Sequence, residues 1–257
     1  MDVFRLHDLS VGRHDAEHVF PLPRDLIRNA ALEFFQGIEV IINFSTSESK
    51  AKEVQEEITV LGGKAHVFQA DITAQEGISE LFDYINSNFR ALDILINNAG
   101  IYIPDFVETH NIDNWDKVFN LNLRSKFLCI QHSIPLLKKS LSPRIINIAT
   151  RGAGKALEES SAYCCAAAGV AMLTEISALE LSKYNIKVNT VSPGLTRTPM
   201  TEKTDTEQDF AEYALKNPSK RIGSPQDIAN VVSFLVSDKA EFINGENINV
   251  SGGIILR

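Results

Sequence analysis

Residues 92–100 read LDILINNAG, an apolar run of strand length that ends in two asparagines, an alanine and a glycine. Similar runs lie at residues 38–44, 64–70, 143–149, 186–192 and 246–252. Segments with helical periodicity lie between or beside them, at residues 25–36, 47–61, 76–89, 114–140, 161–184 and 225–236. Because strands that alternate with helices this regularly form a parallel sheet covered on both faces, the sequence predicts a doubly wound α/β fold in a single domain.

The composition argues against several classes of partner. The chain has 257 residues, with 25 basic and 33 acidic side chains, a formal net charge of −8 and no Lys/Arg run for a nucleic-acid backbone. Because it has no stretch of 18 apolar residues and no signal-like N-terminus, we expect neither a membrane span nor secretion. Its three cysteines include an adjacent pair that suits neither a disulfide framework nor a zinc site. We therefore expect a cytoplasmic protein without a metal.

Ligands of doubly wound sheets bind at the carboxyl ends of the strands, so the loops there are the place to look for function. Four features lie in this region or follow it: Asn97-Asn98-Ala99-Gly100, Thr150 with Tyr163 thirteen residues later, Pro193-Gly194, and the tail at 221–253. In this order and spacing they resemble the short-chain dehydrogenase/reductase family, nearest its 3-oxoacyl-acyl-carrier-protein reductase type, from about Arg28 onward. The resemblance implies a Rossmann-like fold, a nicotinamide dinucleotide and a small-molecule carbonyl or hydroxyl substrate.

The N-terminal part departs from this resemblance. The family's first strand ends in a turn of the form Thr-Gly-x-x-x-Gly-x-Gly, whose glycines let backbone N–H groups approach the pyrophosphate. The equivalent residues 20–27 read FPLPRDLI and contain no glycine. Pro21 and Pro23 have no N–H to donate, so we expect weak or lost dinucleotide binding here. We divide the chain into an atypical N-terminal segment, residues 1–24, and a family-like domain, residues 25–257.

The first strand is also difficult to place from the sequence. A central parallel strand is expected to be almost continuously apolar. Residues 1–19 instead scatter many charged and histidine side chains among few apolar ones, which argues against a buried strand there. Residues 1–6 and residues 18–22 are the two alternatives, and both stay open.

The resemblance implies cofactor contacts at eight positions: Asp71, Asn98, Ala99, Gly100, Tyr163, Pro193, Gly194 and Thr198. Asp71 matches the strand end that contacts adenine, and residues 98–100 match the segment along the nicotinamide ribose. The second strand ends in Asn43-Phe44-Ser45-Thr46, without a carboxylate for a ribose 2′-hydroxyl. The lack of a carboxylate at the end of this strand favours NADP over NAD as the cofactor.

Three residues match the family's catalytic positions: Tyr163, Thr150 and Asn122. Reduction of a ketone requires an acid that protonates the nascent alkoxide and a donor that polarises the carbonyl. Tyr163 matches the acid/base, and Thr150 keeps the hydroxyl of the family's serine. Asn122 matches the helix asparagine that holds a proton-relay water.

The family's catalytic lysine is missing. It follows the tyrosine by four residues, one helical turn, and here that position is Ala167. Without an ammonium below the ring, the Tyr163 phenol should be almost wholly protonated at pH 7, since a free phenol has a pKa of about 10. Arg151 and Lys155 are candidates to replace the charge or to bind an anionic substrate.

These departures leave three functions open. The first is an NADP-dependent oxidoreductase with an impaired or remodelled site. The second is a non-redox acid–base enzyme, an isomerase, dehydratase or cyclase that uses Tyr163 and Thr150. The third is a catalytically silent partner subunit with the same fold.

The resemblance also implies a substrate lid at 199–219 and a homodimer or homotetramer formed through the helices at 114–140 and 161–184.

Overall fold

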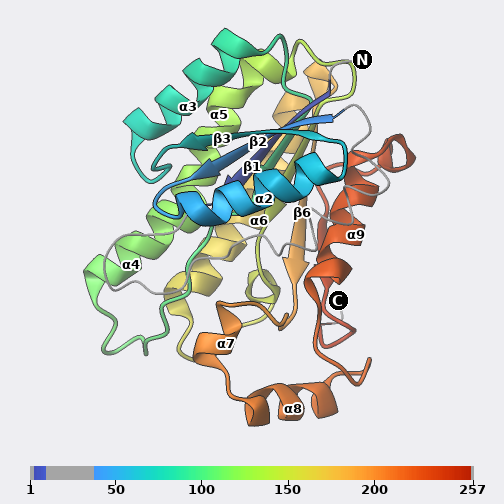
Figure 1. Cartoon of the computed structure of the whole chain (residues 1–257). Coiled ribbons are helices and arrows are strands. Elements are labelled where there is room, and N and C mark those ends of the chain that lie inside the picture. Colours follow the sequence, from blue (N-terminus) through green and yellow to red (C-terminus); the bar gives the residue numbers. More distant parts are fainter. Residues whose placement is uncertain (1–2, 10–37, 256–257) are drawn as a thin grey trace.

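The computed structural model describes residues 3–9 and 38–255 (Figure 1). Within these residues, parallel strands form one seven-stranded sheet in the order β3-β2-β1-β4-β5-β6-β7. The strands are β1 (Val3–Leu9), β2 (Ile38–Phe44), β3 (Lys64–Gln69), β4 (Ile94–Asn97), β5 (Arg144–Ile148), β6 (Lys187–Pro193) and β7 (Asn247–Val250). Because the strand order reverses between β1 and β4, the sheet is doubly wound, and the predicted fold class is confirmed.

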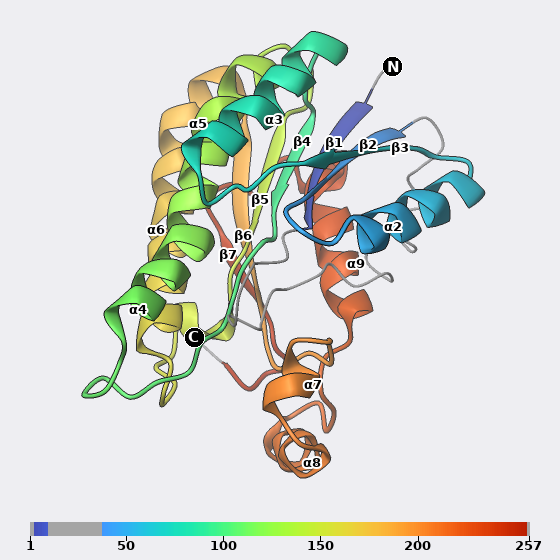
Figure 2. The same ribbon diagram turned by 60° about the vertical axis from the view of Figure 1, so that its left-hand side comes forward.

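Helices cover both faces of the sheet, with α3, α5 and α6 on one face and α2 and α9 on the other (Figure 2). The long helices are α2 (Glu48–Val60), α3 (Gln75–Asn88), α4 (Ile112–Phe119), α5 (Ser125–Leu137), α6 (Ser161–Leu181) and α9 (Pro225–Val236). The short helices η2 (Arg151–Ala153), η3 (Ser182–Tyr184) and η4 (Asp238–Ala240) follow strands or helices. In the segment predicted as a lid, α7 (Thr201–Thr204) and α8 (Glu207–Lys216) lie beyond the carboxyl end of β6 (Figure 1).

The central strands are buried on both faces. Every residue of β4 and β5 is buried, which is why their sequences are apolar runs rather than alternating ones. Neighbouring residues enter opposite cores: Leu95 packs in the core under α3, α5 and α6, and Ile96 in the core under α2 and α9. The sheet therefore holds the loops after β4 and β5 in fixed positions.

β1 lies in the middle of the sheet and pairs with β2 on one side and β4 on the other. It overlaps the first of the two alternatives, residues 1–6, which is confirmed in part although the scattered polar residues argued against a buried strand there. Backbone hydrogen bonding to two neighbours stabilises a strand whatever its side chains are. The domain boundary at residues 24 and 25, the helix at 25–36 and the alternative strand at 18–22 lie outside the described residues.

The helix predicted at 114–140 is confirmed as one helical run over residues 112–137 that contains a π turn. α4 ends at Phe119, a π-helical turn, η1 (Asn120–Arg124), follows, and α5 begins at Ser125. Single π turns inside helices occur frequently at functional sites. Here the turn carries Asn122, one of the predicted catalytic residues.

α6 is the most apolar of the described helices. Together with η3 it forms a 24-residue helix that contains an 18-residue window with a mean hydropathy of 1.5, which by length and composition alone would suffice for a membrane span. Its buried residues Ala162, Ala166 and Ala178 pack into the core on one face of the sheet. Packing therefore accounts for one face of the helix, while Met172, Ile176 and Leu179 are exposed.

Candidate active site

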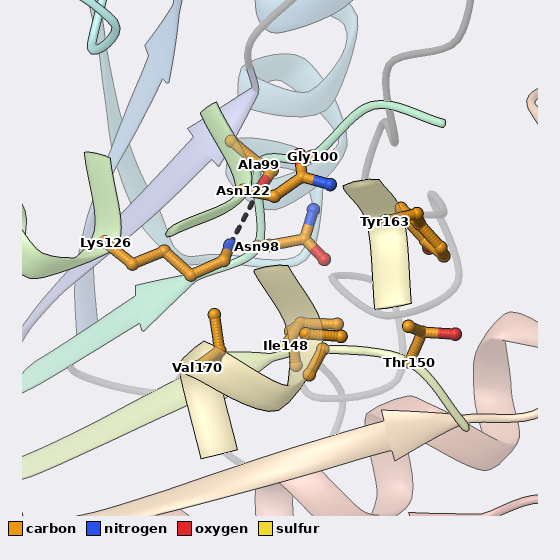
Figure 3. A pocket seen from close by; sticks show the side chains of 11 residues that line it. Asn98, Ala99, Gly100, Asn122, Lys126, Ile148, Thr150, Tyr163 and Val170 are labelled. Atoms are coloured by element: carbon orange, nitrogen blue, oxygen red, sulfur yellow. Dashed lines mark hydrogen bonds between the residues drawn. The ribbon is translucent and has the colours of Figure 1, made fainter. Parts of the chain in front are cut away.

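Six of the predicted residues line one cavity of about 20 Å³ (Figure 3): Asn98, Ala99, Gly100, Asn122, Thr150 and Tyr163. The first three follow β4, and Thr150 follows β5. Tyr163 comes from the first turn of α6, and Asn122 from η1. The cavity lies at the carboxyl ends of adjacent strands, where the fold class predicts a ligand site.

Tyr163 contacts a second tyrosine. Its ring meets that of Tyr102 edge-on, with centroids 5.0 Å apart and planes at 60°. Burial raises the pKa of Tyr163, and a hydrogen bond with Thr150 offsets this only in part. The phenol is therefore protonated at pH 7, as the sequence predicted. Sequence reasoning missed Tyr102, whose hydroxyl lies 3.1 Å from Ser160 Oγ.

Thr150 is buried and begins η2 in an extended conformation. Its Oγ1 lies 3.5 Å from the backbone nitrogen of Gly152. A Cβ on Gly152 would lie only 2.7 Å from Cys164 Sγ, so this turn packs closely against α6. The close packing holds the Thr150 hydroxyl against the helix that carries Tyr163.

The Asn122 side chain binds the backbone after β4. Its Oδ1 accepts a hydrogen bond from the Ile101 nitrogen at 2.8 Å, and its Nδ2 donates to the Ile101 carbonyl at 2.8 Å. Gly100 packs beside it, since a Cβ there would lie 3.4 Å from Asn122 Oδ1. The amide thus fixes the turn at 97–100, and its part in holding a relay water stays a prediction.

Asn98 contributes a buried polar atom to the cavity. The side chain is 6% exposed and points into the pocket (Figure 3). Its Nδ2 has no hydrogen-bond partner among the described residues. Because a buried N–H without a partner costs free energy, this atom marks a place where a polar ligand group would be stabilised.

Two residues that line the cavity bear on the positive charge that the family's lysine would supply. Ala167, one turn after Tyr163, lines the cavity, and so does Lys126 from α5. Sequence reasoning missed Lys126, although its spacing of four residues from Asn122 places both on one helix face. Of the cations that the sequence suggested, Arg151 lies over the Tyr213 ring, 5.1 Å from its centroid, and Lys155 is exposed. Neither is among the residues that line this cavity.

Asp71 lies in a second, larger cavity of about 810 Å³ at the carboxyl ends of β2 and β3, together with Ser45 and Thr46. Its Oδ1 accepts hydrogen bonds from the nitrogen and the hydroxyl of Thr73, at 2.9 and 2.7 Å. The carboxylate therefore organises the turn that leads into α3.

The two cavities adjoin. Gly100 and Asn122 line the smaller one, and their chain neighbours Ile101 and Leu121 line the larger one. One extended ligand could therefore span both, along the carboxyl ends of β2, β3, β4 and β5.

The remaining predicted cofactor residues lie outside the lining of both cavities. Gly194 follows β6, donates to the Val250 carbonyl at 2.9 Å and lines a separate cavity of about 80 Å³. Pro193 is the last residue of β6, and Thr198 is buried at the start of α7, with its hydroxyl 3.2 Å from that of Thr201. Their cofactor contacts stay predictions, and residues 20–27 lie outside the described residues.

Comparisons with known proteins agree with this arrangement. A family model described as enoyl-(acyl carrier protein) reductase matches residues 30–255. The 3-oxoacyl-acyl-carrier-protein reductase FabG of Staphylococcus epidermidis is 34% identical over 235 residues, 91% of this chain and 96% of that protein. A 3-oxoacyl-acyl-carrier-protein reductase of Synechocystis is 33% identical over 221 residues, 86% and 88% of the two chains. The structure of acetoin dehydrogenase from Enterobacter cloacae superposes with a TM-score of 0.83 at 25% identity, covering 99% of this chain and 96% of that one.

The doubly wound sheet, with a cavity beyond β4 and β5 that polar side chains line in part, defines a Rossmann-like α/β protein. With a family match over most of its length, the chain belongs to the short-chain dehydrogenase/reductase family. The resemblance to the 3-oxoacyl-acyl-carrier-protein reductase type that its motifs predicted is confirmed.

Proposed function

We propose that this chain is an oxidoreductase that interconverts a carbonyl and a hydroxyl group of a small molecule with a nicotinamide dinucleotide. The observation that carries this proposal is the shared cavity of Tyr163 and Thr150, which brings an acid and a hydroxyl donor together. The names of two relatives, a 3-oxoacyl reductase and an acetoin dehydrogenase, describe carbonyl compounds and support the same reaction class.

In the reducing direction, Tyr163 is the proton donor. Burial raises the pKa of its phenol, so the hydroxyl is protonated at neutral pH and can give its proton to the oxygen that gains negative charge. The Thr150 hydroxyl donates a hydrogen bond to the same oxygen and stabilises that charge. A bound reduced nicotinamide would supply the hydride.

The residues present fit a dinucleotide. The buried Asn98 Nδ2, which has no partner among the described residues, is a donor for a ribose hydroxyl or a carboxamide. The larger cavity, about 810 Å³, is within the usual size range of cofactor sites. We infer that residues 98–100 would hold the nicotinamide ribose and that Asp71 would line the adenosine end.

We infer further that NADP(H) is preferred over NAD(H). β2 ends at Phe44, and the residues that line the larger cavity after it are Ser45 and Thr46, whose hydroxyls can donate to a phosphate. An acidic side chain at this place would instead bind a free ribose 2′-hydroxyl and repel a 2′-phosphate.

The site is remodelled, because Ala167 stands where the family has its lysine. The other two functions that the sequence left open, a non-redox acid–base enzyme and a silent partner subunit, do not need hydride transfer. Both are therefore distinguishable from the proposed function by dinucleotide binding.

Calorimetric titration of the purified protein with NADPH and with NADH tests the proposal. We expect binding of NADPH tighter than about 100 μM, equivalent to more than about 5.5 kcal/mol, and weaker binding of NADH. Absence of binding by either dinucleotide would overturn the oxidoreductase and leave the non-redox enzyme or the silent subunit.

We also propose that the protein assembles as a homodimer or homotetramer through α5 and α6. These helices expose four large apolar side chains: Phe127, Met172, Ile176 and Leu179. Apolar side chains gathered on a surface favour a protein interface. Light scattering should give a mass of two or four chains, and a 28.5 kDa monomer at micromolar concentration would contradict this assembly.

A further inference from the structure

The smaller cavity contains a lysine, although the family resemblance places its lysine elsewhere. Position 167, one turn after Tyr163 on α6, is an alanine whose side chain carries no charge. Lys126 lines the same cavity from α5. Both positions are buried, with exposed fractions of 6% for Ala167 and 3% for Lys126.

Two backbone carbonyls hold the Lys126 ammonium. Nζ donates to the Asn97 carbonyl at 3.1 Å and to the Ala99 carbonyl at 2.7 Å, and Figure 3 shows the second of these bonds. Both carbonyls belong to the turn at 97–100, the segment that also carries Asn98. The ammonium is therefore fixed beside the group that we infer would hold the nicotinamide ribose.

Burying a lysine is costly because the ammonium loses its hydration, and lysine is among the residues least often buried. Most other buried positions of α5 are apolar, among them Leu128, Cys129 and Ile130. The two buried serines, Ser125 and Ser133, carry no charge and donate to nearby backbone carbonyls. A charged side chain buried in the same cavity as Tyr163 is better explained by a use for its charge.

The packing of α6 gives the lysine side chain its space. α6 presents small residues here: Ala166 and Ala167 are buried, and a Cβ on Gly169 would lie 2.8 Å from Leu123 Cδ2 of η1. Lysines at both 126 and 167 would bring two ammonium groups into a cavity of about 20 Å³. An alanine at 167 avoids this repulsion.

We propose that Lys126 is the cationic cofactor-binding residue of this site, entering from α5 in place of the lysine that α6 lacks at Ala167. Its ammonium, held at the turn at 97–100, would donate to the ribose hydroxyls of the bound dinucleotide. This inference rests on the proposed function, since it assigns a ligand contact within the same site.

The first test is a comparison of NADPH affinity among single variants. Lys126→Met keeps the length and burial of the side chain but removes the charge, and we expect a dissociation constant at least about tenfold larger. Lys139→Met removes an exposed lysine just beyond the end of α5 and should leave it unchanged. Thermal unfolding of each variant confirms that the protein measured is folded.

An exchange of the two positions separates a cationic role from a merely structural one. Lys126→Val combined with Ala167→Lys returns a lysine to the cavity from α6. We expect its NADPH affinity to recover to within about threefold of the native protein, whereas Ala167→Lys alone should bind worse than native because it crowds two cations. If the exchange variant binds as weakly as Lys126→Met, Lys126 only holds the turn at 97–100, and the inference is overturned.

A measurement without ligand completes the test. In protein with ¹⁵N-labelled lysine, the resonance of Lys126 Nζ is identified as the one that disappears in Lys126→Met. We expect this resonance to be that of a charged ammonium at pH 7. The resonance of a neutral amine would overturn the cationic role. NADPH binding that Lys126→Met leaves unchanged would overturn this inference alone. Failure of the native protein to bind any dinucleotide would overturn the proposed function and the ribose contact with it.

Discussion

The two adjoining cavities at the strand ends hold their polar groups in different ways. In the smaller cavity Asn122, Lys126 and Thr150 are buried and hydrogen-bonded within the fold. The larger cavity is lined by exposed acids, among them Glu76 and Glu80. Buried groups keep a fixed geometry in a low dielectric, while water and salt screen exposed ones. This difference is why we propose that the chemistry takes place in the smaller cavity and that the larger one contributes mainly volume.

The largest effect is expected at Tyr163. Tyr163→Phe removes the proton donor and should lower kcat for carbonyl reduction by about 10³-fold, while NADPH affinity falls much less. Steady-state kinetics and calorimetry measure the two quantities. Tyr102→Phe is the matched control, because its ring contacts Tyr163 but its hydroxyl bonds Ser160. A Tyr163→Phe enzyme as active as the Tyr102→Phe enzyme would remove the chemistry from the smaller cavity.

The second effect concerns the polarising hydroxyl. Thr150→Val keeps the shape of the side chain but removes the donor to the developing oxyanion, and kcat should fall by about 10²-fold. Thr150→Ser restores a hydroxyl and should restore most of the rate. Equal rates for the valine and serine variants would show that the hydroxyl takes no part.

The third effect concerns folding stability. Asn122→Ala leaves the buried N–H and carbonyl of Ile101 without their amide partner, and should lower the free energy of unfolding by about 2–3 kcal/mol. Urea unfolding measures this change. The control Asn120→Ala, at an exposed position of the same π turn, should cost less than about 1 kcal/mol. If both variants cost the same, the bonds to Ile101 do not hold the smaller cavity.

The smallest effect is expected in the larger cavity. Replacing Glu76 and Glu80 together by glutamine removes two exposed charges from its lining. NADPH affinity should rise only about two- to threefold in dilute buffer and be unchanged in about 1 M salt. An increase above tenfold that persists in high salt would erase the contrast between the two cavities.

Most of the fold could be predicted from the sequence because the central strands are buried on both faces. That burial produces the apolar runs at 92–98 and 143–149, which contain β4 and β5. β1 could not be placed in this way, since its residues are not continuously apolar and its position is set by pairing with β2 and β4. The π turn η1 within the long helix could not be predicted either, because the spacing of apolar residues does not indicate it.

The site was predictable where residues matched a family motif and not where contacts cross between helices. The motifs indicated Tyr163, Thr150 and the turn at 97–100, and the structure places them around one cavity. A lysine in the segment LRSKFL is normally exposed, so its burial against the turn at 97–100 depends on tertiary packing that the sequence does not display. The sequence therefore indicated that position 167 lacks the family's lysine, but it did not indicate that Lys126 lies in the same cavity.

Isotope transfer tests the central claim most directly. The native protein is incubated with NADPH deuterated at nicotinamide C4 and a panel of 3-oxoacyl thioesters and small hydroxyketones and diketones, and the products are analysed by mass spectrometry. The account predicts one deuterium on the carbinol carbon of a product alcohol, formed at least about 10²-fold more slowly by Tyr163→Phe. Bound NADPH with no deuterium in any product of the panel would contradict it.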